Sequence, residues 1–285
     1  MIKISVVILT YNSAGYIKSC LDSVYRQSFR DFEVIVVDNG SKDETISLIK
    51  EAYPRVSLIE NQDNLGACKG RNQGIEVALG EWIATLDCDI ILENNFLWEI
   101  VKIIEHAPKT AGMIQPKIMN AAKATIFSAG IYVSCLRRFH DLGKNKIDSV
   151  KFSKQKNIFG VCSAAAVYNK GMLESVRDAH GYFDERFFFL FEDVDLSWRA
   201  RKKGMQAIFC PDAVCSHHGD SSRTPARIRQ YLSLRNRYFT LLKNDFSFRL
   251  IFCFIFYDLV RLFYILMTNP YALRAVKDVF IFKRG

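Results

Sequence analysis

Residues 181–204 (GYFDERFFFLFEDVDLSWRARKKG) combine aromatic and acidic side chains in a pattern that could do chemistry. An aromatic run at 187–191 precedes two adjacent carboxylates, Glu192 and Asp193, which open a predicted helix. Acidic side chains in a first helical turn lie near unpaired N–H groups and the positive end of the helix dipole. We expect such a carboxylate to stay ionised and fixed, which suits a general base. A capped helix behind an aromatic core strand is the structural alternative, and for one Glu-Asp pair alone it is the commoner one.

A second pair of carboxylates, Asp87 and Asp89, flanks Cys88 after a predicted strand. Side chains alternate along an extended segment, so the two aspartates can point the same way. They repel each other unless a cation lies between them, and oxygen ligands with open positions suit Mg²⁺ or Mn²⁺, which often bridge to substrate phosphates. A DxD triplet is common by chance. Its place at the end of a buried strand predicts a metal–diphosphate site, without choosing between Mg²⁺ and Mn²⁺.

A third ligand for this cation could come from His217 or His218. Adjacent histidines are more often structural or at the surface than bound to a metal. The predicted site, however, has two carboxylates and lacks a third protein ligand. We therefore expect one of the two to reach it and leave open which one.

Further polar residues follow two other predicted strands. They are Thr10, Tyr11 and Asn12 after the first strand, and Asp38, Asn39, Gly40 and Ser41 after the second. Ordinary turn chemistry explains each group alone. Three such groups at one edge of a sheet favour nucleotide binding.

The segment 64–72 (NLGACKGRN) offers a candidate anion site. It begins with Asn64, and Gly66 permits close backbone approach just before a predicted helix. Lys69 and Arg71 add positive charge. A solvated first helical turn is the alternative for this segment taken alone.

The elements that must position these residues alternate between strand and helix. Apolar, β-branched runs predict strands, and helical spacing predicts the helices between them. The predicted strands are 4–9, 33–37, 56–60 and 82–86, and the predicted helices 14–27, 42–52, 67–79 and 94–106. This order predicts an α/β fold with a mostly parallel sheet flanked by helices, which binds ligands beyond the carboxyl ends of its strands. Later strands are predicted at 159–168 and 207–210, while 121–156 shows no clear periodicity.

The composition is that of a globular protein. The chain has 285 residues, of which 49% are apolar and 24% charged, so it can bury a full core. Its eight cysteines form no CxxC pair, which argues against a zinc ribbon or a disulfide framework and fits a reducing cytosol. The N-terminus predicts a first strand and is too quickly polar for a signal peptide.

The net positive charge of the chain comes entirely from its C-terminal part. Residues 221–285 hold twelve Lys and Arg against three acidic residues, whereas the first 220 hold 27 of each. Such asymmetry predicts a surface that meets nucleic acid or anionic lipid. The first 220 residues are neutral and the tail is too apolar for a helix that reads a groove, which disfavours nucleic acid.

Residues 246–267 form the one candidate membrane segment. Three charges interrupt it, Arg249, Asp258 and Arg261, and charges at mid-membrane are costly. The basic residues around it favour a helix that lies on an anionic membrane surface. A helix packed on the catalytic domain and an oligomer interface are the alternatives.

Together these segments resemble the family-2 glycosyltransferases, inverting enzymes with a GT-A fold. The resemblance rests on VVILTYNS, VVDNGSKDET, NLGACKGRNQGI, DCD and GYFDERFFFLFEDVDLSWR, in that order between about residues 4 and 222. The nearest likeness is to rhamnosyltransferase-like enzymes of bacterial surface polysaccharide assembly. A Rossmann dehydrogenase is disfavoured because TYNSAG stands where GxGxxG is needed.

The resemblance implies a role for each candidate residue. Asp193 would be the catalytic base, with Glu192 orienting or assisting it. Asp89 would bind the metal, Asp87 would contact ribose or metal-bound water, and His217 would complete the metal shell. Asp38 would hold a uracil or thymine ring, and Arg71 would approach the donor. The other expected nucleotide-sugar residues are Thr10, Tyr11, Asn12, Asn39, Ser41, Asn64 and Gly66. Cys68 and Lys69 depart from the family pattern, so the sugar pocket is expected to be unusual.

The resemblance also implies a function and a domain organisation. The expected reaction moves a sugar from a UDP- or dTDP-sugar to a hydroxyl of a glycan or polyprenyl-linked acceptor, with Mn²⁺ or Mg²⁺ as cofactor. Residues 1–222 would form the catalytic domain and 223–285 a basic helical extension. The extension would place the enzyme on the cytoplasmic face of the cell membrane. A non-catalytic relative that binds a nucleotide sugar as a partner subunit is the alternative, and the oligomeric state stays open.

Overall fold

The first half of the chain alternates strands and helices, as the sequence predicts. The structure, a computed structural model, describes residues 3–121, 124–149, 152, 158–219, 224–245 and 254–282. The first-half elements are β1 (Ile4–Thr10), α1 (Ile17–Tyr25), β2 (Phe32–Asp38), α2 (Thr45–Ala52), β3 (Ser57–Glu60), α3 (Gly66–Val77), β4 (Trp82–Asp87), β5 (Ile90–Leu92) and α4 (Phe96–His106). Each predicted strand and helix of this half is present, with ends that move by up to a few residues.

The second half holds predicted elements together with several that the sequence left unassigned. They are β6 (Ala111–Asn120), β7 (Ile126–Ser128), β8 (Ile131–Val133), β9 (Phe139–Asp141), β10 (Ala165–Asn169), α6 (Lys170–Val176), η1 (Glu185–Phe187), α7 (Glu192–Lys202) and β11 (Gln206–His217). The strand predicted at 159–168 begins only at Ala165, and the one predicted at 207–210 continues to His217. Strands β8 and β9 pair as a separate antiparallel hairpin.

The central sheet is parallel in its first half and mixed in its second. Its strand order is β3-β2-β1-β4-β10-β6-β11-β5, with β7 paired to β6. Crossover helices make β1, β2, β3 and β4 run parallel, whereas β10 lies antiparallel between β4 and β6. The expectation of a mostly parallel sheet therefore holds for the first half, whereas the second half combines the parallel pair β6–β11 with antiparallel pairs. Within the first half the register pairs Thr10 with Asp38 and Leu9 with Asp87, so these strand ends meet at one edge.

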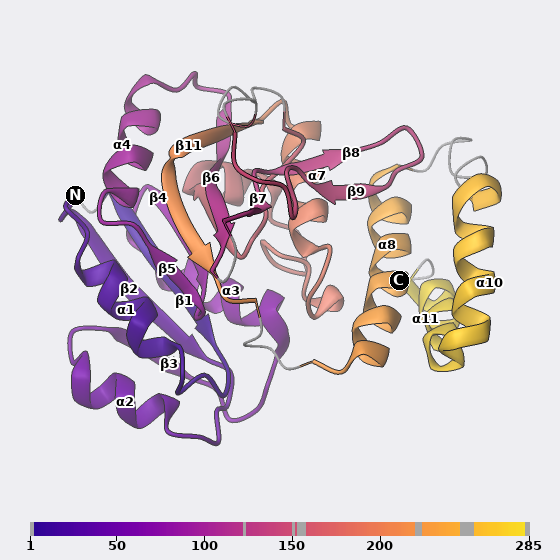
Figure 1. Ribbon diagram of the computed structural model, residues 1–285, viewed down its shortest axis with the longest axis horizontal. Coiled ribbons are helices and arrows are strands. Elements are labelled where there is room, and N and C mark those ends of the chain that lie inside the picture. Colours follow the sequence, from indigo (N-terminus) through magenta and orange to yellow (C-terminus); the bar gives the residue numbers. More distant parts are fainter. Residues whose placement is uncertain are drawn as a thin grey trace.

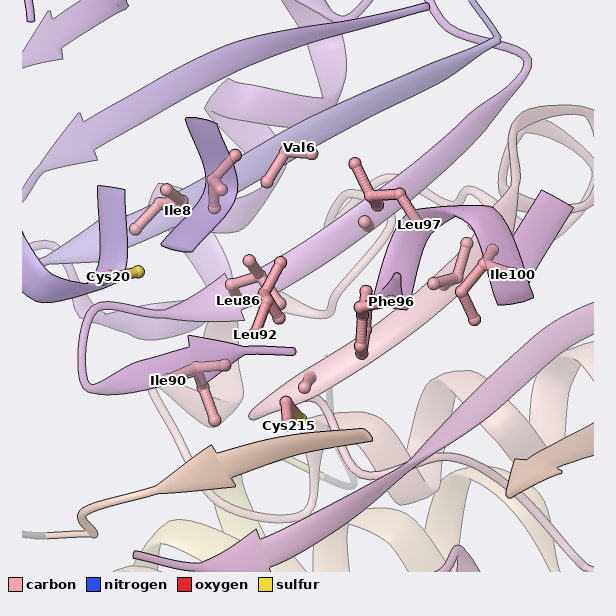
Figure 2. Close-up of a cluster of buried hydrophobic side chains, with 14 of the residues drawn as sticks. Val6, Ile8, Cys20, Leu86, Ile90, Leu92, Phe96, Leu97, Ile100 and Cys215 are labelled. Atoms are coloured by element: carbon pink, nitrogen blue, oxygen red, sulfur yellow. The ribbon is translucent and has the colours of Figure 1, made fainter. Parts of the chain in front are cut away.

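Helices cover both faces of this sheet, and alternate residues of β1 explain why (Figure 1). Ile4, Val6 and Ile8 pack with α1 and α4, in the cluster that Figure 2 shows, while Val7 packs with α3, α6 and α7 on the other face. A strand buried on both faces reads as a continuous apolar run, as β1 does.

The C-terminal helices pack against the preceding elements through α8 and through Phe282 of α11. They are α8 (Ala226–Asn244), η2 (Phe254–Asp258), α10 (Leu259–Thr268), η3 (Pro270–Leu273) and α11 (Arg274–Phe282). Phe239 of α8 belongs to the same buried cluster as α3 and α7, and α10 and α11 lie on the far side of α8 (Figure 1). Helix α8 precedes the candidate membrane segment 246–267, so its packing leaves the alternatives for that segment open. Residues 246–253 of the candidate membrane segment, with Arg223, Lys283 and Arg284, lie outside the described residues.

Helices α10 and α11 carry a set of exposed apolar side chains. No helix in the described ranges is both long and apolar enough to cross a membrane. The exposed apolar residues of η2, α10 and α11, here called the apolar C-terminal face, are Ile255, Phe256, Leu259, Val260, Phe263, Tyr264, Met267, Val276, Phe280 and Ile281.

Candidate active site

A cleft of about 560 Å³ opens at the carboxyl ends of β1, β2 and β4. Its far walls come from the β8–β9 hairpin, from residues 188–194 before and within α7, and from the end of β11. The predicted site residues in its lining are Thr10, Tyr11, Asn39, Asn64, Gly66, Arg71, Asp87, Glu192, Asp193 and His217. Side chains more than 200 residues apart in the sequence therefore face one volume.

Asp87, Asp89 and His217 form a group that could hold a metal ion. One ligand atom of each lies within 4.8 Å of the others, and His217 Nε2 is 3.2 Å from an Asp89 carboxylate oxygen. The pairing of β11 with β5 brings His217 opposite Ile90, next to Asp89. His218 is exposed and lies against the Tyr16 ring, so His217 is the member of the pair that joins the group. Two carboxylates and an imidazole nitrogen suit Mn²⁺ or Mg²⁺, so these residues fit the predicted cation.

Burial and neighbouring charges together shift the pKa values of Asp87 and His217. Burial raises the pKa of Asp87, against the opposing charge of Arg71. For His217, burial alone would lower the pKa, but the hydrogen bond and charge of Asp89 outweigh it and raise the pKa. The Phe127 ring stands edge-on to the imidazole of His217 at 4.3 Å between centroids, which fixes the plane of that ring.

Arg71 ties the metal side of the cleft to the predicted catalytic pair. Its guanidinium donates to Asp87 Oδ1 at 2.7 Å and to Glu192 Oε1 at 2.8 Å, and the residue is only 3% exposed. The sequence places Arg71 near the donor without revealing these partners, which are 16 and 121 residues away. The bridge holds the end of β4 against the first turn of α7.

Glu192 and Asp193 differ in their surroundings. Glu192 is buried and accepts hydrogen bonds from Arg71 and from the Ser163 hydroxyl at 3.1 Å. Asp193 lines the cleft, and its carboxylate accepts from the backbone N–H groups of Val194 at 2.8 Å and Ser163 at 3.3 Å. Glu192 is therefore held by protein groups, while Asp193 is open to a ligand.

The surroundings of Asp193 act against the expectation that its carboxylate stays ionised. Asp193 lines the cleft and is partly buried. Burial, followed by the negative charges of Glu192 and Asp141, raises the pKa of Asp193 to about 8. These effects outweigh the two N–H groups and the helix dipole, which act in the opposite sense. The protonated form of Asp193 is therefore favoured more than that of an exposed aspartate, and Asp193 can act as a base only after this proton leaves.

Three predicted nucleotide residues lie behind the cleft and not in its lining. Both carboxylate oxygens of the buried Asp38 accept hydrogen bonds from its own turn. Oδ1 accepts from the N–H groups of Gly40 and Ser41, and Oδ2 accepts from the Ser41 hydroxyl at 2.5 Å. Asn12 accepts from the Lys42 N–H at 2.7 Å, and its own N–H donates to Ser41. Asp38, Asn12 and Ser41 therefore shape the loops, and Asn39 is the residue of this turn that reaches the cleft.

The sequence missed the residues on the opposite wall. Phe127, Phe139, His140, Asp141 and Lys144 line the cleft from β7 and the β8–β9 hairpin, and Lys144 pairs with Asp141 at 3.0 Å. The three-residue strands there are too short to show an alternating pattern, so no periodicity could have revealed them. Their effect on Asp193 arises only when the hairpin folds over the cleft.

A family model described as glycosyl transferase family 2 matches residues 5–177, more than half of the chain. The chain belongs to that family. The matched range covers β1 to α6 and includes Asp87, Asp89 and Arg71. The family-2 chain continues beyond it with α7, β11 and the C-terminal helices, where Asp193 and His217 lie.

Three curated relatives are similar to parts of this family-2 chain. An uncharacterised glycosyltransferase, YibD of Escherichia coli, is 39% identical over 90 residues, 30% of this chain and 26% of its own length. The amylovoran biosynthesis glycosyltransferase AmsB of Erwinia amylovora is 26% identical over 222 residues, 76% of this chain and 70% of its own. The poly-β-1,6-N-acetyl-D-glucosamine synthase of Staphylococcus aureus is 23% identical over 219 residues, 74% of this chain and 49% of its own. The chain thus spans only part of these relatives, and for two of them half or less.

Solved structures show the same fold. The mannosyltransferase PcManGT of Pyrobaculum calidifontis, solved with GDP-Man and Mn²⁺, matches with a TM-score of 0.61 and 20% identity over 97% of this chain and 73% of its own. S. aureus TarS, solved with UDP-GlcNAc, matches with a TM-score of 0.57 and 20% identity over 86% of this chain and 68% of its own. The family-2 chain therefore has the GT-A fold and is similar to glycosyltransferases, among them one of amylovoran biosynthesis.

Proposed function

We propose that this family-2 enzyme transfers a sugar, with inversion, from a nucleotide-diphosphosugar to an acceptor hydroxyl and needs a divalent cation to do so. The donor is a UDP- or dTDP-sugar, and the acceptor is a glycan or polyprenyl-linked glycan of the cell surface. One observation carries the proposal: Asp193 lines the same cleft as Asp87 and His217, which form a possible metal group with the buried Asp89. Similar proteins solved with GDP-Man and Mn²⁺ and with UDP-GlcNAc support it.

In the proposed reaction Asp193 takes the proton of the acceptor hydroxyl. The hydroxyl oxygen attacks the anomeric carbon from the face opposite the diphosphate, so a carbon–oxygen bond forms on one face as the bond to the diphosphate breaks on the other. Because a single displacement occurs, the anomeric centre inverts. A bound cation would neutralise charge on the leaving diphosphate. Asp87, Asp89 and His217 would hold that cation.

The other carboxylate of the pair keeps the base in place. Glu192 stays bonded to Arg71 and Ser163, so the first turn of α7 cannot rotate without breaking a buried ion pair. Its negative charge also raises the proton affinity of Asp193, which makes the deprotonated form a stronger base. Arg71 thus serves catalysis by fixing the distance between the metal side and the base.

A thermal-shift panel tests the donor and metal parts of the proposal. UDP-, dTDP- and GDP-sugars are added to the wild type with and without Mn²⁺, and we expect one nucleotide class to raise the melting temperature only with metal. The Asp89→Asn variant should lose the metal-dependent part of that rise. No shift with any donor would refute the proposal.

A transfer assay separates an enzyme from a non-catalytic nucleotide-sugar-binding partner subunit. With the donor from the panel, the wild type should form a product of inverted anomeric configuration. Asp193→Asn should abolish transfer while it keeps the donor-induced thermal shift. A wild type that binds the donor and transfers to no glycan or polyprenyl-linked acceptor would favour the binding module.

The proposal includes peripheral binding to the cytoplasmic face of the membrane. The apolar C-terminal face lies on η2, α10 and α11, and helices α8 and α11 also carry basic residues, among them Arg227, Arg274 and Lys277. Apolar side chains with flanking cations suit the surface of an anionic bilayer, where a polyprenyl-linked acceptor would be found.

A further inference from the structure

We infer that Arg235 and Asn236 of α8 are positioning residues for the catalytic base. They hold the backbone of residues 187–191, here called the aromatic loop, which leads directly into Glu192 and Asp193. The two residues are here called the α8 clamp. This inference rests on the proposed function, since it gives the clamp a part in the transfer reaction.

The aromatic loop has a backbone that bulky residues rarely adopt. Phe188 has φ 66° and ψ −64°, and the Phe189 N–H donates to the Phe187 carbonyl at 2.8 Å, which makes a γ-turn of the strained, positive-φ kind. Leu190 and Phe191 also have positive φ, at 70° and 69°. Such conformations persist only where surrounding contacts impose them. The loop therefore needs partners outside itself.

Asn236 supplies three of those contacts. The two N–H groups of its side-chain amide are shared among the carbonyls of Phe187 at 2.9 Å, Phe189 at 2.8 Å and Leu190 at 2.8 Å, and the residue is fully buried. Its amide oxygen accepts from the Arg235 guanidinium, which fixes which end of the amide faces the loop. One side chain thus spans the turn from Phe187 to Leu190.

Arg235 adds hydrogen bonds to the backbone just before the aromatic loop and at its first residue. Its guanidinium donates to the Arg186 carbonyl at 3.0 Å and the Phe187 carbonyl at 2.8 Å. The opposite side of the loop is held by α3, because the Cys68 N–H donates to the Phe188 carbonyl at 3.1 Å. The aromatic loop is thus fixed between α3 and α8.

The geometry connects the clamp to the chemistry. Phe191 is the residue before α7, and its carbonyl accepts the Asp195 N–H at 2.9 Å, so the loop sets where the first helical turn begins. That turn carries Asp193, and the loop itself lines the cleft from Phe188 to Phe191. If the clamp is lost, the strained turn can relax and Asp193 shifts relative to the acceptor hydroxyl. In the described part of the chain, the predicted donor-binding residues on β1 and β4 make no contact with the α8 clamp, so we expect donor binding to be kept.

The decisive experiment compares Asn236→Ala with Asn244→Ala. Both asparagines are buried on α8, but Asn244 contacts Asp195 and the Thr240 carbonyl and not the aromatic loop. At a temperature where all proteins are folded, we expect Asn236→Ala to lower kcat about 100-fold with little change in the KM of the donor. Asn244→Ala should lower the melting temperature comparably and leave kcat within about threefold of the wild type.

Amide hydrogen exchange gives a second readout that needs no turnover. Peptides covering 186–195 should exchange faster in Asn236→Ala than in the wild type or Asn244→Ala. If Asn236→Ala does not fold, Arg235→Lys removes the two-pronged contact with Arg186 and Phe187 and should lower kcat about tenfold.

The outcomes separate this inference from the proposed function. An active wild type whose kcat is the same in Asn236→Ala, or is lowered equally by both alanine variants, overturns the inference. Unchanged exchange at 186–195 also overturns it. An inactive wild type with each donor of the panel contradicts the proposed function instead, and the exchange data then still decide whether α8 restrains the loop.

Discussion

Replacing Asp193 with asparagine should stop sugar transfer and at the same time make the protein more stable. Asp193 is partly buried and its carboxylate faces the charges of Glu192 and Asp141, which together raise its pKa from 3.8 to about 8. Folding therefore costs free energy wherever the unfolded chain would hold Asp193 ionised. An amide in the same place carries no charge and avoids this cost.

The size of the gain follows from the pKa. At pH 7 the raised pKa is worth about 4 kcal/mol at most, at about 1.4 kcal/mol for each pH unit between the folded and unfolded values. The amide gives up one of the two acceptor oxygens that face Val194 and Ser163, which costs about 1 kcal/mol. Water in the cleft screens part of the rest. We expect a net gain of about 1–2 kcal/mol, or about 2–6 °C in melting temperature.

The pH dependence of stability tests the direction of the predicted change a second time. Because the pKa of Asp193 is higher in the folded than in the unfolded protein, its contribution to the free energy of unfolding is most favourable below about pH 4. This contribution falls as the pH rises and is lost above about pH 8. The asparagine variant has no such group. Its advantage over the wild type should be absent near pH 4 and complete near pH 8, in thermal melts recorded without metal or donor.

Asp195 is the matched control, two residues further along α7. It is fully buried, but it accepts from Arg199 at 2.8 Å and from Asn244 at 2.7 Å. Asp195→Asn leaves cations without their partner and should lower the free energy of unfolding by about 3 kcal/mol. A melting temperature of Asp193→Asn that is below the wild type at pH 8, or a difference that does not change with pH, would refute the reasoning.

Three further predictions follow from the cleft and the C-terminal helices. The kcat/KM of the wild type should rise about tenfold per pH unit and level off near pH 8, as Asp193 loses its proton; a flat profile from pH 6 to 9 would contradict its role as base. Gly66→Ala should lower the free energy of unfolding by more than about 2 kcal/mol in denaturant melts, because φ is +86° and the new Cβ would lie 2.5 Å from the Phe188 ring; a change under about 0.5 kcal/mol would contradict this. Phe263→Ser should weaken cosedimentation with anionic vesicles about tenfold, while Trp98→Ser, an equally drastic change at an exposed ring on α4, should not; equal binding by all three proteins would contradict membrane docking through α10.

The family and the site segments could be predicted because their signals are local. An apolar run such as Ile4–Thr10 marks a strand by composition alone, and polar residues just after it must lie at the sheet edge where that strand ends. Asp87 and Asp89 follow β4 in this way, and Glu192 opens α7 as expected. The family match over residues 5–177 confirms the resemblance on which those segments were assigned.

Single elements did not reveal how residues pair across the fold. Nothing in the pattern around Arg71 shows that it bridges Asp87 and Glu192, and nothing around Asp38 shows that its oxygens are consumed by its own turn. The hairpin that brings Asp141 over the cleft is made of three-residue strands. These contacts depend on where distant segments meet.

The sequence by itself determined the fold class, the alternation of strands and helices in the first half and the presence of two carboxylate pairs, because periodicity and turn chemistry act over a few residues. Only the tertiary structure decided which groups are charged, which face the cleft and what holds them. Asp193 changes from an expected ionised base to a group with a pKa near 8 because Glu192, Asp141 and burial act on it together. The α8 clamp acts on a loop nearly fifty residues earlier. Electrostatic and packing energies depend on distance in space, which a local sequence pattern does not contain.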